Sequence, residues 1–346
     1  MHIPDGFLDL TTSAGAAVVA AGAVGVSLRR ARTELGETGP ALAGLVACFV
    51  FAVQMVNFPV GAGTSGHLLG GALAATLVGP WTATLVMTAV LLVQGLVFAD
   101  GGLTALGANI TDMGVVGVLV GYLAVRGALA VLPRRPSCVV PAAAVGGFLS
   151  VPAAALAFTL LYAVGGTAPV PLDALATAML GWHVVIGIGE AVITAAVVGA
   201  VVASRPDLIH AARHLAPELV LVDADGTRHV VGADGHAGAT AARPRLGART
   251  AAALLGASLV VGGGLSLLAS SHPDGLEYVG ERLGFGARAH ESAVASSPLA
   301  DYALAWLPGS VWATVLAGVI GVLLTLVVGL GLARLARLAG RTGADA

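Results

Sequence analysis

The sequence predicts an all-α, polytopic membrane protein, and three observations support that class. Of its 346 residues, 57% are hydrophobic and only 10% are charged, and the mean hydropathy is +0.92. That much apolar surface exceeds what one water-soluble core of this size can bury. The chain also contains 49 glycines, and small residues let membrane helices approach one another closely.

Nine apolar segments are predicted as helices, judged against the roughly 20 residues that cross a bilayer. The third is short and is bounded by Gly66 and by Gly79-Pro80, so it is either a partial span or a tilted helix of the core. We expect a bundle of about seven spans followed by a two-span helical hairpin. The segments cover residues 10–28, 40–57, 66–79, 80–99, 105–125, 138–163, 174–203, 249–269 and 308–333.

The arginines indicate the orientation, because cytoplasmic loops of membrane proteins carry an excess of basic residues. All but Arg282 and Arg288 fall in loops that this arrangement places on one side. We therefore predict a bacterial inner-membrane protein with its N-terminus outside and its C-terminus in the cytoplasm. The arginines on the common side are Arg29, Arg30, Arg32, Arg126, Arg134, Arg135, Arg205, Arg213, Arg228, Arg243, Arg245, Arg249, Arg334, Arg337 and Arg341.

The remaining composition excludes several functions. All seventeen basic residues are arginine, so the sequence has no lysine for a phosphate-binding loop or for a Schiff base. The net charge of -2 gives no sign of nucleic-acid binding. Cys48 and Cys138 stand in apolar runs and are expected to pack rather than to form a disulfide. The opening lacks the features of a secretory signal, so we expect Met1 to keep a free amine.

Met1 and His2 can together chelate a metal ion. The α-amine, the amide nitrogen of His2 and its imidazole close a five-membered and then a six-membered ring around one ion. With the amide deprotonated, three nitrogens in one plane favour square-planar ions, Ni(II) or Cu(II) and also Co(II), over Zn or Mg. A histidine after the initiator methionine carries little weight alone, because any residue can stand there.

His67 is the candidate for a fourth nitrogen. It follows Gly63 to Gly66, where Thr64 or Ser65 is expected to cap a helix and the glycines allow close approach of the backbone. At a helix N-terminus the dipole disfavours an imidazolium, which leaves a neutral ring with a free lone pair. The alternative is a histidine hydrogen-bonded in a polar helix start. The N-terminal chelate on the same membrane face favours the ligand role.

His183 and Glu190 lie seven residues apart on the seventh predicted span and therefore share one helical face. Glu190 is the only charge well inside a predicted span, and an ionisable residue there marks a functional site. We expect both residues to support a metal ligand through hydrogen bonds rather than to bind the ion. Polar contacts between neighbouring helices are the alternative.

Asp100, Asn109 and Asp112 flank a glycine-rich turn at the outer end of the fourth and fifth spans. Capping and turn formation are a sufficient structural reason for such residues. We expect these three residues to help pack the N-terminal loop, and we favour direct ligation less.

These motifs together resemble one family, the substrate-capture subunits of energy-coupling-factor (ECF) transporters for cobalt and nickel, called CbiM or NikM. The resemblance covers about the first 205 residues. A later stretch, Ser271-His272-Pro273-Asp274-Gly275-Leu276-Glu277, is similar to the signature of the small companion subunit, CbiN or NikN. The first set of motifs is Met-His-Ile-Pro-Asp-Gly-Phe at 1–7, Gly-Thr-Ser-Gly-His-Leu-Leu-Gly at 63–70, Ala-Asp-Gly-Gly-Leu-Thr-Ala-Leu-Gly-Ala-Asn at 99–109 and His-Val-Val-Ile-Gly-Ile-Gly-Glu at 183–190.

The resemblance implies a fusion of the two subunits. Residues 1–204 would form the capture domain, 205–248 a cytoplasmic linker with a small hairpin, and 249–346 the two-span companion domain. The metal, Co(II) or Ni(II), would be held as transported ligand by Met1, His2 and His67. Pro4-Asp5 replaces the Met-Glu of many relatives, at positions that bind no metal.

The resemblance also implies that this chain is not itself an enzyme. Transport would require a coupling protein, the T component (CbiQ or NikQ), and a pair of ATPases (CbiO or NikO) that hydrolyse ATP. A self-sufficient secondary transporter or channel would instead need polar residues along a path through the bilayer. An intramembrane metalloenzyme would need a motif such as His-Glu-x-x-His, which the sequence lacks. Cobalt and nickel are not distinguished, because the same four nitrogens serve both.

Overall fold

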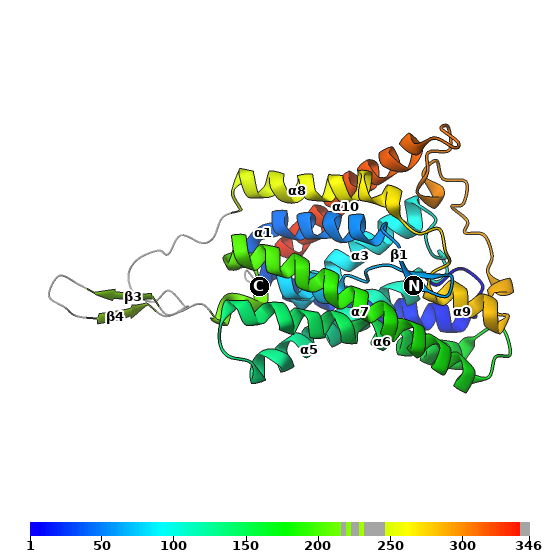
Figure 1. Ribbon diagram of the computed structural model, residues 1–346, viewed down its shortest axis with the longest axis horizontal. Coiled ribbons are helices and arrows are strands. Elements are labelled where there is room, and N and C mark those ends of the chain that lie inside the picture. The colour runs from blue at the N-terminus through cyan, green and yellow to red at the C-terminus, as the bar shows by residue number, and fades with distance from the viewer. Residues whose placement is uncertain (216–218, 223–227, 232–245, 340–346) are drawn as a thin grey trace.

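The computed structural model is a bundle of long helices that lie side by side along one axis (Figure 1). It describes residues 1–215, 219–222, 228–231 and 246–339. The larger elements, in chain order, are α1 (Leu10–Gln54), β1 (Phe58–Gly61), β2 (Thr64–Gly66), α2 (Gly71–Val78), α3 (Pro80–Val97), α4 (Leu106–Asn109), the π-helix η1 (Ile110–Val116), α5 (Gly117–Val131), α6 (Val139–Gly165), α7 (Leu172–Ser204), β3 (Leu219–Val222), β4 (Arg228–Val231), α8 (Ala248–Gly263), α9 (Gly275–Leu283) and α10 (Val311–Leu338). Short 3-10 helices are η2 (Pro136–Cys138), η3 (Pro206–Leu208), η4 (His210–Leu215), η5 (Leu265–Leu268), η6 (Gly286–Arg288) and η7 (Ala300–Tyr302).

Seven helical segments of the described ranges are long and apolar enough to cross a membrane, which confirms the predicted fold class. The last two enclose the loop that contains α9, so the C-terminal region is a helical hairpin. The seven are Leu10–Leu35, Pro80–Val97, Leu106–Val131, Pro136–Gly165, Leu172–Ser204, Ala248–Leu268 and Val311–Leu338.

The other two predicted segments are shorter than a span. Residues 40–57 correspond to the second half of α1, Gly39–Gln54, which a kink at Gly39 (φ 79°) and Pro40 separates from the first half. The predicted third span is α2, which has eight residues, all buried. Eight residues rise only about 12 Å along a helix, so α2 is a helix of the core rather than a span.

Local sequence signals explain where several helices begin. The Asp9 carboxylate accepts a hydrogen bond from the Thr12 amide and caps α1. Pro80 opens α3, a position where its missing N–H costs nothing. Asp274 caps α9 in a capping box, in which the Glu277 side chain also accepts the Asp274 amide.

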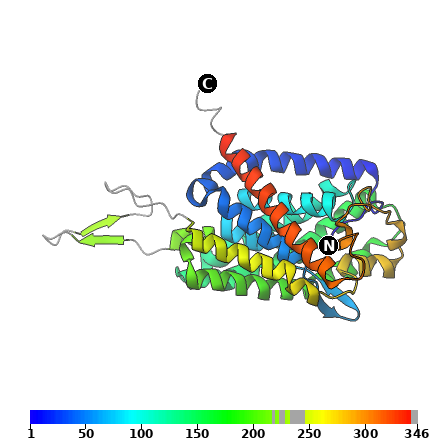
Figure 2. The same ribbon diagram turned by 90° about the horizontal axis from the view of Figure 1, so that it is seen from above.

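Glycines bring the C-terminal hairpin against the first helix and against itself. A Cβ at Gly318 of α10 would lie 2.0 Å from the Gly262 carbonyl oxygen of α8. A Cβ at Gly321 would lie 2.2 Å from the Phe51 ring of α1, and one at Gly44 of α1 would lie 2.7 Å from Leu330. The two regions of the chain therefore form one continuous bundle, seen from above in Figure 2, with α10 crossing α1.

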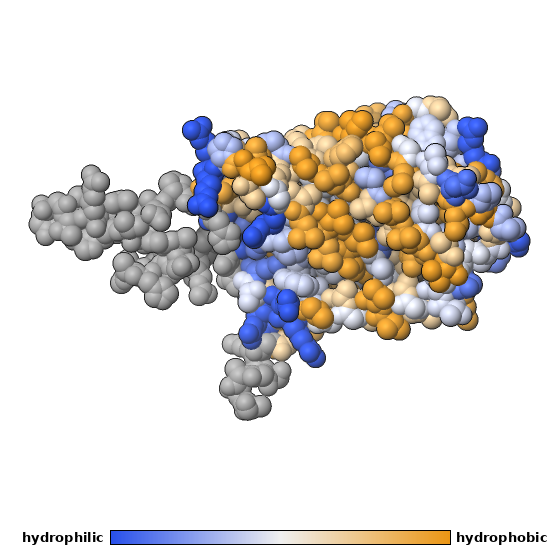
Figure 3. Space-filling model, turned by 90° about the horizontal axis from the view of Figure 1, so that it is seen from below, coloured by the Kyte–Doolittle hydropathy of each residue, from blue (hydrophilic) through white to orange (hydrophobic). Residues whose placement is uncertain are grey.

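The bundle has two polar ends separated by an apolar band (Figure 3). Side chains of the band are exposed although they are apolar, for example Val18, Leu160 and Val192 at 73%, 60% and 64% exposure, which is expected for surfaces that face lipid. The end that carries Met1 to Asp9 and the loop containing α9 is called the N-terminal face below.

The opposite end is called the arginine face. There the Arg30 guanidinium lies 4.9 Å above the Trp81 ring at the start of α3. Arg337 near the end of α10 donates a hydrogen bond to the Leu35 carbonyl at 3.0 Å. The antiparallel hairpin of β3 and β4 lies beyond this end (Figure 1). The rest of the predicted 205–248 linker lies partly outside the described residues.

Candidate metal centre

The N-terminal loop, Met1 to Asp9, enters the bundle rather than lying on it. Met1 is 3% exposed and Ile3 is fully buried. The Asn109 side chain pairs with both polar groups of the Ile3 backbone, accepting its amide at 2.7 Å and donating to its carbonyl at 3.1 Å. The Gly102 amide donates to the same carbonyl at 2.9 Å. Both polar groups of the Ile3 backbone are therefore paired inside the bundle, mainly by the Asn109 side chain.

Asp5 makes a second attachment. Its carboxylate accepts the amides of Leu103 and Thr104 at 3.1 and 2.8 Å, and it also accepts the Thr104 hydroxyl. The approach requires glycine at position 102, where a Cβ would lie 2.2 Å from the Asp5 nitrogen. The glycine-rich turn after Asp100 thus serves as the docking surface for the first residues of the chain.

The Met1 amine lies between His67 and Asp274. It contacts His67 Nε2 and lies 2.8 Å from Asp274 Oδ2. His67 Nδ1 donates to the Leu68 carbonyl at 3.0 Å, so the proton of a neutral ring is on Nδ1 and the Nε2 lone pair faces the amine. The contact brings together two of the nitrogens that the sequence analysis assigned to one ion.

Asp274 is ionised in this setting. Burial opposes its ionisation, but the positive charge of the Met1 amine outweighs burial and holds the pKa of its carboxyl well below the ordinary value. The carboxylate is thus a fixed negative charge beside the amine.

His67 lies in a different local structure from the one predicted. Thr64 to Gly66 form the short strand β2, paired with β1, and α2 begins only after Gly70, which makes no side-chain cap. The expected capping by Thr64 or Ser65 is wrong, because the Ser65 hydroxyl donates to the His272 carbonyl at 2.8 Å. The Leu68 carbonyl, rather than a helix dipole, therefore sets the proton position of His67.

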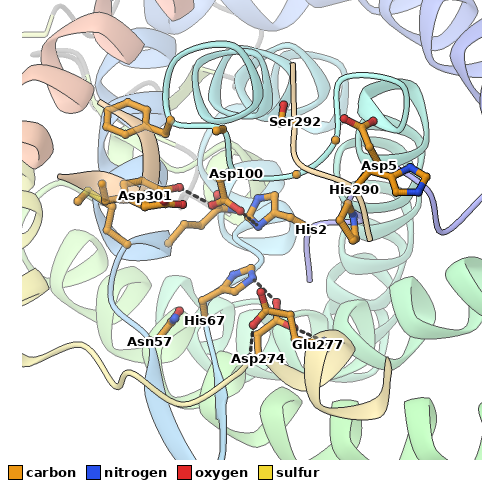
Figure 4. A pocket seen from close by; sticks show the side chains of 18 residues that line it. His2, Asp5, Asn57, His67, Asp100, Asp274, Glu277, His290, Ser292 and Asp301 are labelled. Carbon is orange, nitrogen blue, oxygen red and sulfur yellow. Dashed lines mark hydrogen bonds and ion pairs between the residues drawn. The ribbon is translucent and has the colours of Figure 1, made fainter. Parts of the chain in front are cut away.

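The His2 ring lies beside His67 in the same cavity (Figure 4). The two rings stack with centroids 5.2 Å apart and planes 21° apart. His2 Nδ1 is 3.1 Å from Asp100 Oδ1, and His2 Nε2 is 3.1 Å from Gln94 Oε1. Burial lowers the pKa of His2 to about 4, against the opposing effect of Asp100, so the ring is neutral at pH 7.

Of the supporting residues that the sequence proposed, Asp100 and Asn109 contact the N-terminal loop directly, and Glu190 acts on the segment after His67. The Glu190 carboxylate is fully buried and accepts the amides of Leu69 and Gly70 at 2.6 and 3.0 Å. These bonds hold the chain just past His67 against α7. The carboxylate does not contact Met1, His2 or His67.

His183 lies close to the centre without joining it. Its Nδ1 donates to the Met179 carbonyl at 2.7 Å, and its buried Nε2 has no hydrogen-bond partner among the described residues. Nε2 faces the loop of α9, since a Cβ at Gly275 would lie 3.3 Å away. His183, Met1, His67 and Asp274 line a small void of about 10 Å³, roughly the space of one water molecule.

Glu190 is not the only charge buried in a span, contrary to the sequence-based expectation. Glu34 of α1 is buried at the arginine face and accepts the amides of Trp81 and Thr82 at 3.2 and 2.6 Å. Asp112, in the π-helix η1, is fully buried, and neither of its oxygens has a hydrogen-bond partner among the described residues. The predicted helix 10–28 ended before Glu34, whereas α1 continues past it.

A cavity of about 300 Å³ adjoins His2 and His67 and reaches the surface of the N-terminal face. Carboxylates from three separate segments line it, which gives a cation a favourable approach. They are Asp5, Asp100, Asp274, Glu277 and Asp301 (Figure 4).

No group of three histidine, cysteine, aspartate or glutamate side chains within the described ranges is arranged to hold a metal ion. The ligand set Met1, His2 and His67 remains a prediction that the geometry is compatible with.

Three residues of the centre were not singled out from the sequence, namely Asp274, Gln94 and Tyr302. Asp274 belongs to a motif that was noticed, but the motif carries no sign of its partner. The Tyr302 hydroxyl donates to Asp100, and only the fold brings residues so distant in the chain together.

Comparison with known proteins gives two matched regions. Residues 2–208 match the family described as the cobalt uptake substrate-specific transmembrane region, CbiM. Residues 248–338 match the PDGLE domain. The two matches adjoin the segment 209–247, which contains the β3–β4 hairpin.

Named relatives match over long stretches. The fused nickel transport protein NikMN of Rhodobacter capsulatus is 34% identical over 353 residues, which covers 96% of each chain. The cobalt transport protein CbiM of Sorangium cellulosum is 34% identical over 220 residues, 60% of this chain and 94% of that protein. A crystal structure of a truncated transition metal transporter is 33% identical with a TM-score of 0.51, covering 59% of this chain and 99% of that one.

Proposed function

Because this chain belongs to the CbiM family of metal transport membrane proteins and carries a PDGLE domain behind it, we propose that it is the metal-capturing subunit of an ECF-type, ATP-driven importer. Its cargo would be Co(II) or Ni(II). The family and its relatives' names support metal transport, and the geometry of the N-terminal loop supports capture at that end of the bundle.

The proposed capture site is a plane of four nitrogens. They are the Met1 amine, the deprotonated amide nitrogen of His2, its imidazole Nδ1 and His67 Nε2. The observation that carries the proposal is the buried contact of the Met1 amine with His67 Nε2, since a loop that merely covered the bundle would have no reason to bury its charged end.

Loading requires three local changes, one of which is the loss of the proton from the His2 amide nitrogen to the solvent. The Met1 ammonium must lose its proton before its nitrogen can bind an ion, which dissolves the ion pair with Asp274. His2 Nδ1 must exchange its contact with Asp100 for the metal. Both carboxylates lie beside the site and remain as neighbouring negative charges that favour a divalent cation.

The proposed topology places the N-terminal face outside and the arginine face in the cytoplasm. It rests on the loops with excess arginine. Residues 1–204 would capture the ion, 205–248 would link, and 249–346 would form the companion domain. A T component and an ATPase pair would supply the transport step from the membrane and the cytoplasm.

The test is equilibrium binding of Ni(II) to the purified full chain, compared with a variant extended by one alanine before Met1. The extension replaces the free amine by an amide but keeps both histidines, so we expect most of the affinity to be lost. His67→Ala should give the same loss. Unchanged affinity in either variant would count against the site. Uptake by the chain alone, undiminished without any ATPase partner, would instead favour a secondary transporter.

A further inference from the structure

The chain contains only two glutamines, Gln54 and Gln94, and the structure places both in one hydrogen-bonded line that ends at His2. Gln54 is the last residue of α1 and Gln94 is on α3, and both side chains are buried, at 4% and 0% exposure. Buried amides need hydrogen-bond partners for their donors and acceptors. The neighbouring groups therefore determine which way each side-chain amide points its oxygen and its nitrogen.

The line begins at the Leu69 carbonyl, which can only accept. Gln54 Nε2 donates to it at 2.6 Å. Gln54 Oε1 therefore faces the other way and accepts Gln94 Nε2 at 2.9 Å. A flipped Gln54 would set its own oxygen against the Leu69 oxygen, two acceptors at hydrogen-bond distance.

The orientation of the two amides then determines which atom of Gln94 faces His2. With its Nε2 committed to Gln54, Gln94 presents Oε1 to His2 Nε2 at 3.1 Å. An amide oxygen accepts and cannot donate, so the best match at His2 Nε2 is an N–H.

We propose that Gln54 and Gln94, hydrogen-bonded in series to the Leu69 carbonyl, form a relay that presents the acceptor Gln94 Oε1 to His2 Nε2. This acceptor stabilises the imidazole tautomer with its proton on Nε2, which binds the metal through Nδ1. The inference rests on the proposed function. It makes both glutamines positioning residues, because neither touches the ion.

The relay completes a parallel between the two histidines. His67 donates its Nδ1 proton to the Leu68 carbonyl directly, which leaves Nε2 for the metal. In the loaded protein, His2 donates its Nε2 proton to Gln94 Oε1, and Gln94 and Gln54 connect this bond in series to the Leu69 carbonyl, which leaves Nδ1 for the metal. Glu190 holds this short segment by the amides of Leu69 and Gly70, so one rigid piece of backbone sets the proton position of both rings.

Asp100 competes for the other His2 nitrogen. Its carboxylate lies 3.1 Å from Nδ1 and attracts a proton there when no ion is present. When the ion takes Nδ1, the ring proton must be on Nε2, where a buried N–H without an acceptor would weaken binding. Gln94 Oε1 supplies that acceptor in advance.

The first test measures the Ni(II) affinity of the purified full chain in four variants. We expect Gln94→Met and Gln54→Met each to weaken binding about tenfold or more, the usual effect of losing a hydrogen-bond partner behind a metal ligand. Gln54→Glu should stay within about threefold of the parent, because burial keeps the acid protonated, with one O–H for Leu69 and one C=O for Gln94. Thr88→Val is the control, since the Thr88 hydroxyl bonds only to its own helix at Thr84.

The double variant Gln54→Met/Gln94→Met decides whether the two residues act as one line. A single relay predicts that the double change costs no more than the larger single change. Multiplied losses, or a Gln54→Met protein that binds like the parent, would overturn the proposal. If Gln94→Met does not fold, the comparison of Gln54→Glu with Gln54→Met still decides it.

A spectroscopic measurement separates the relay from general structural damage. Square-planar Ni(II) is diamagnetic, so a ¹⁵N-histidine NMR spectrum of the loaded protein can record the His2 Nε2–H. The relay predicts slow exchange of this proton in the parent and fast exchange in Gln54→Met. Equal exchange in both would contradict it. If the N-terminally extended protein binds Ni(II) as tightly as the parent, the proposed function fails; if extension abolishes binding but both glutamine variants bind normally, the relay alone fails.

Discussion

The amine nitrogen of Met1 lies 2.8 Å from a carboxylate oxygen of Asp274, so the first residue of the chain is paired with the loop between α8 and α10, which belongs to the PDGLE domain and is called the PDGLE loop below. Both side chains are largely buried, at 2% and 12% exposure. Further bonds accompany the pair. The His290 amide donates to the Asp5 carbonyl at 2.9 Å, and the Ser65 amide donates to the Pro273 carbonyl at 2.9 Å. The PDGLE loop therefore covers the N-terminal loop and holds it in place.

Replacing Asp274 should release the first residue. Asparagine caps a helix as well as aspartate does, so Asp274→Asn keeps α9 and removes only the charge beside the amine. Breaking a buried pair from one side costs about 3–5 kcal/mol, and we expect a lower unfolding temperature and an accessible amine. Because the sequence has no lysine, an amine-acylating reagent followed by mass spectrometry reports on Met1 alone.

The control for this change is Asp301→Asn, an exposed carboxylate of the same loop that lines the same cavity. Asparagine tolerates the positive φ of 52° at this position. The Met1 amine of the Asp301→Asn variant should react with the acylating reagent as slowly as that of the parent protein. Slow labelling in Asp274→Asn as well would show that the ion pair does not hold Met1.

The stability of the folded protein should depend on pH through His2. Burial lowers the pKa of His2 from 6.5 to about 4, so between these values the unfolded chain binds a proton that the folded protein does not. Stability is therefore lost as the pH falls from about 6.5 towards 4 and is fully present above 6.5. The loss is at most about 3.5 kcal/mol, at roughly 1.4 kcal/mol for each pKa unit.

Thermal unfolding of the parent and of His2→Phe over this pH range measures that contribution. The parent should lose more stability than the variant as the pH falls to 4, and the two curves should run parallel below pH 4. Parallel curves over the whole range would contradict a neutral, buried His2.

Glu190 and its counterpart Glu34 offer a matched pair of substitutions. Each buried carboxylate accepts two successive backbone amides, Glu190 in the middle of α7 and Glu34 at the arginine face. Glutamine offers only one oxygen, so either change leaves a donor unpaired at a cost of about 1–3 kcal/mol. Only Glu190→Gln should also weaken Ni(II) binding, because only that segment carries His67. Equal affinities in the two variants would remove Glu190 from the support of the site.

Gly102→Ala should dislodge the N-terminal loop. Its Cβ would lie 2.2 Å from the Asp5 nitrogen, whereas a Cβ at Gly22 of α1 would meet nothing within 4 Å. Gly22→Ala should therefore be neutral or stabilising, by up to about 1 kcal/mol from helix propensity. We expect weaker Ni(II) binding and faster acylation of Met1 only in Gly102→Ala, and parent-like behaviour there would mean that the loop is not docked on this turn.

The sequence was sufficient to predict the membrane helices and three residues that the fold brings together at the candidate site, because both predictions depend on local signals. Long apolar runs predicted the membrane helices, and Met1, His2 and His67 were proposed from the chemistry of their nitrogens. The short α2 was ambiguous, since a buried helix and a span differ in length more than in composition. The strand β2 was missed because glycine and threonine before His67 suit a helix cap and an extended segment alike.

The partners of the site could not be predicted in the same way. Asp274 caps its own helix, and that local role gave no reason to expect a second role at Met1. Gln54 and Gln94 are isolated polar residues in apolar helices, and only the crossing of α1 and α3 puts them in line. Such pairings depend on how helices pack, which single-sequence patterns do not specify.

The glycine contacts of α10 with α8 and of both with α1 have one more consequence. Because the helices of the two parts pack directly against one another at these glycines, we expect the parts to associate without a continuous backbone between residues 208 and 248. Co-expressed as two polypeptides cut in that stretch, they should reassemble in the membrane and co-purify through a tag on either piece.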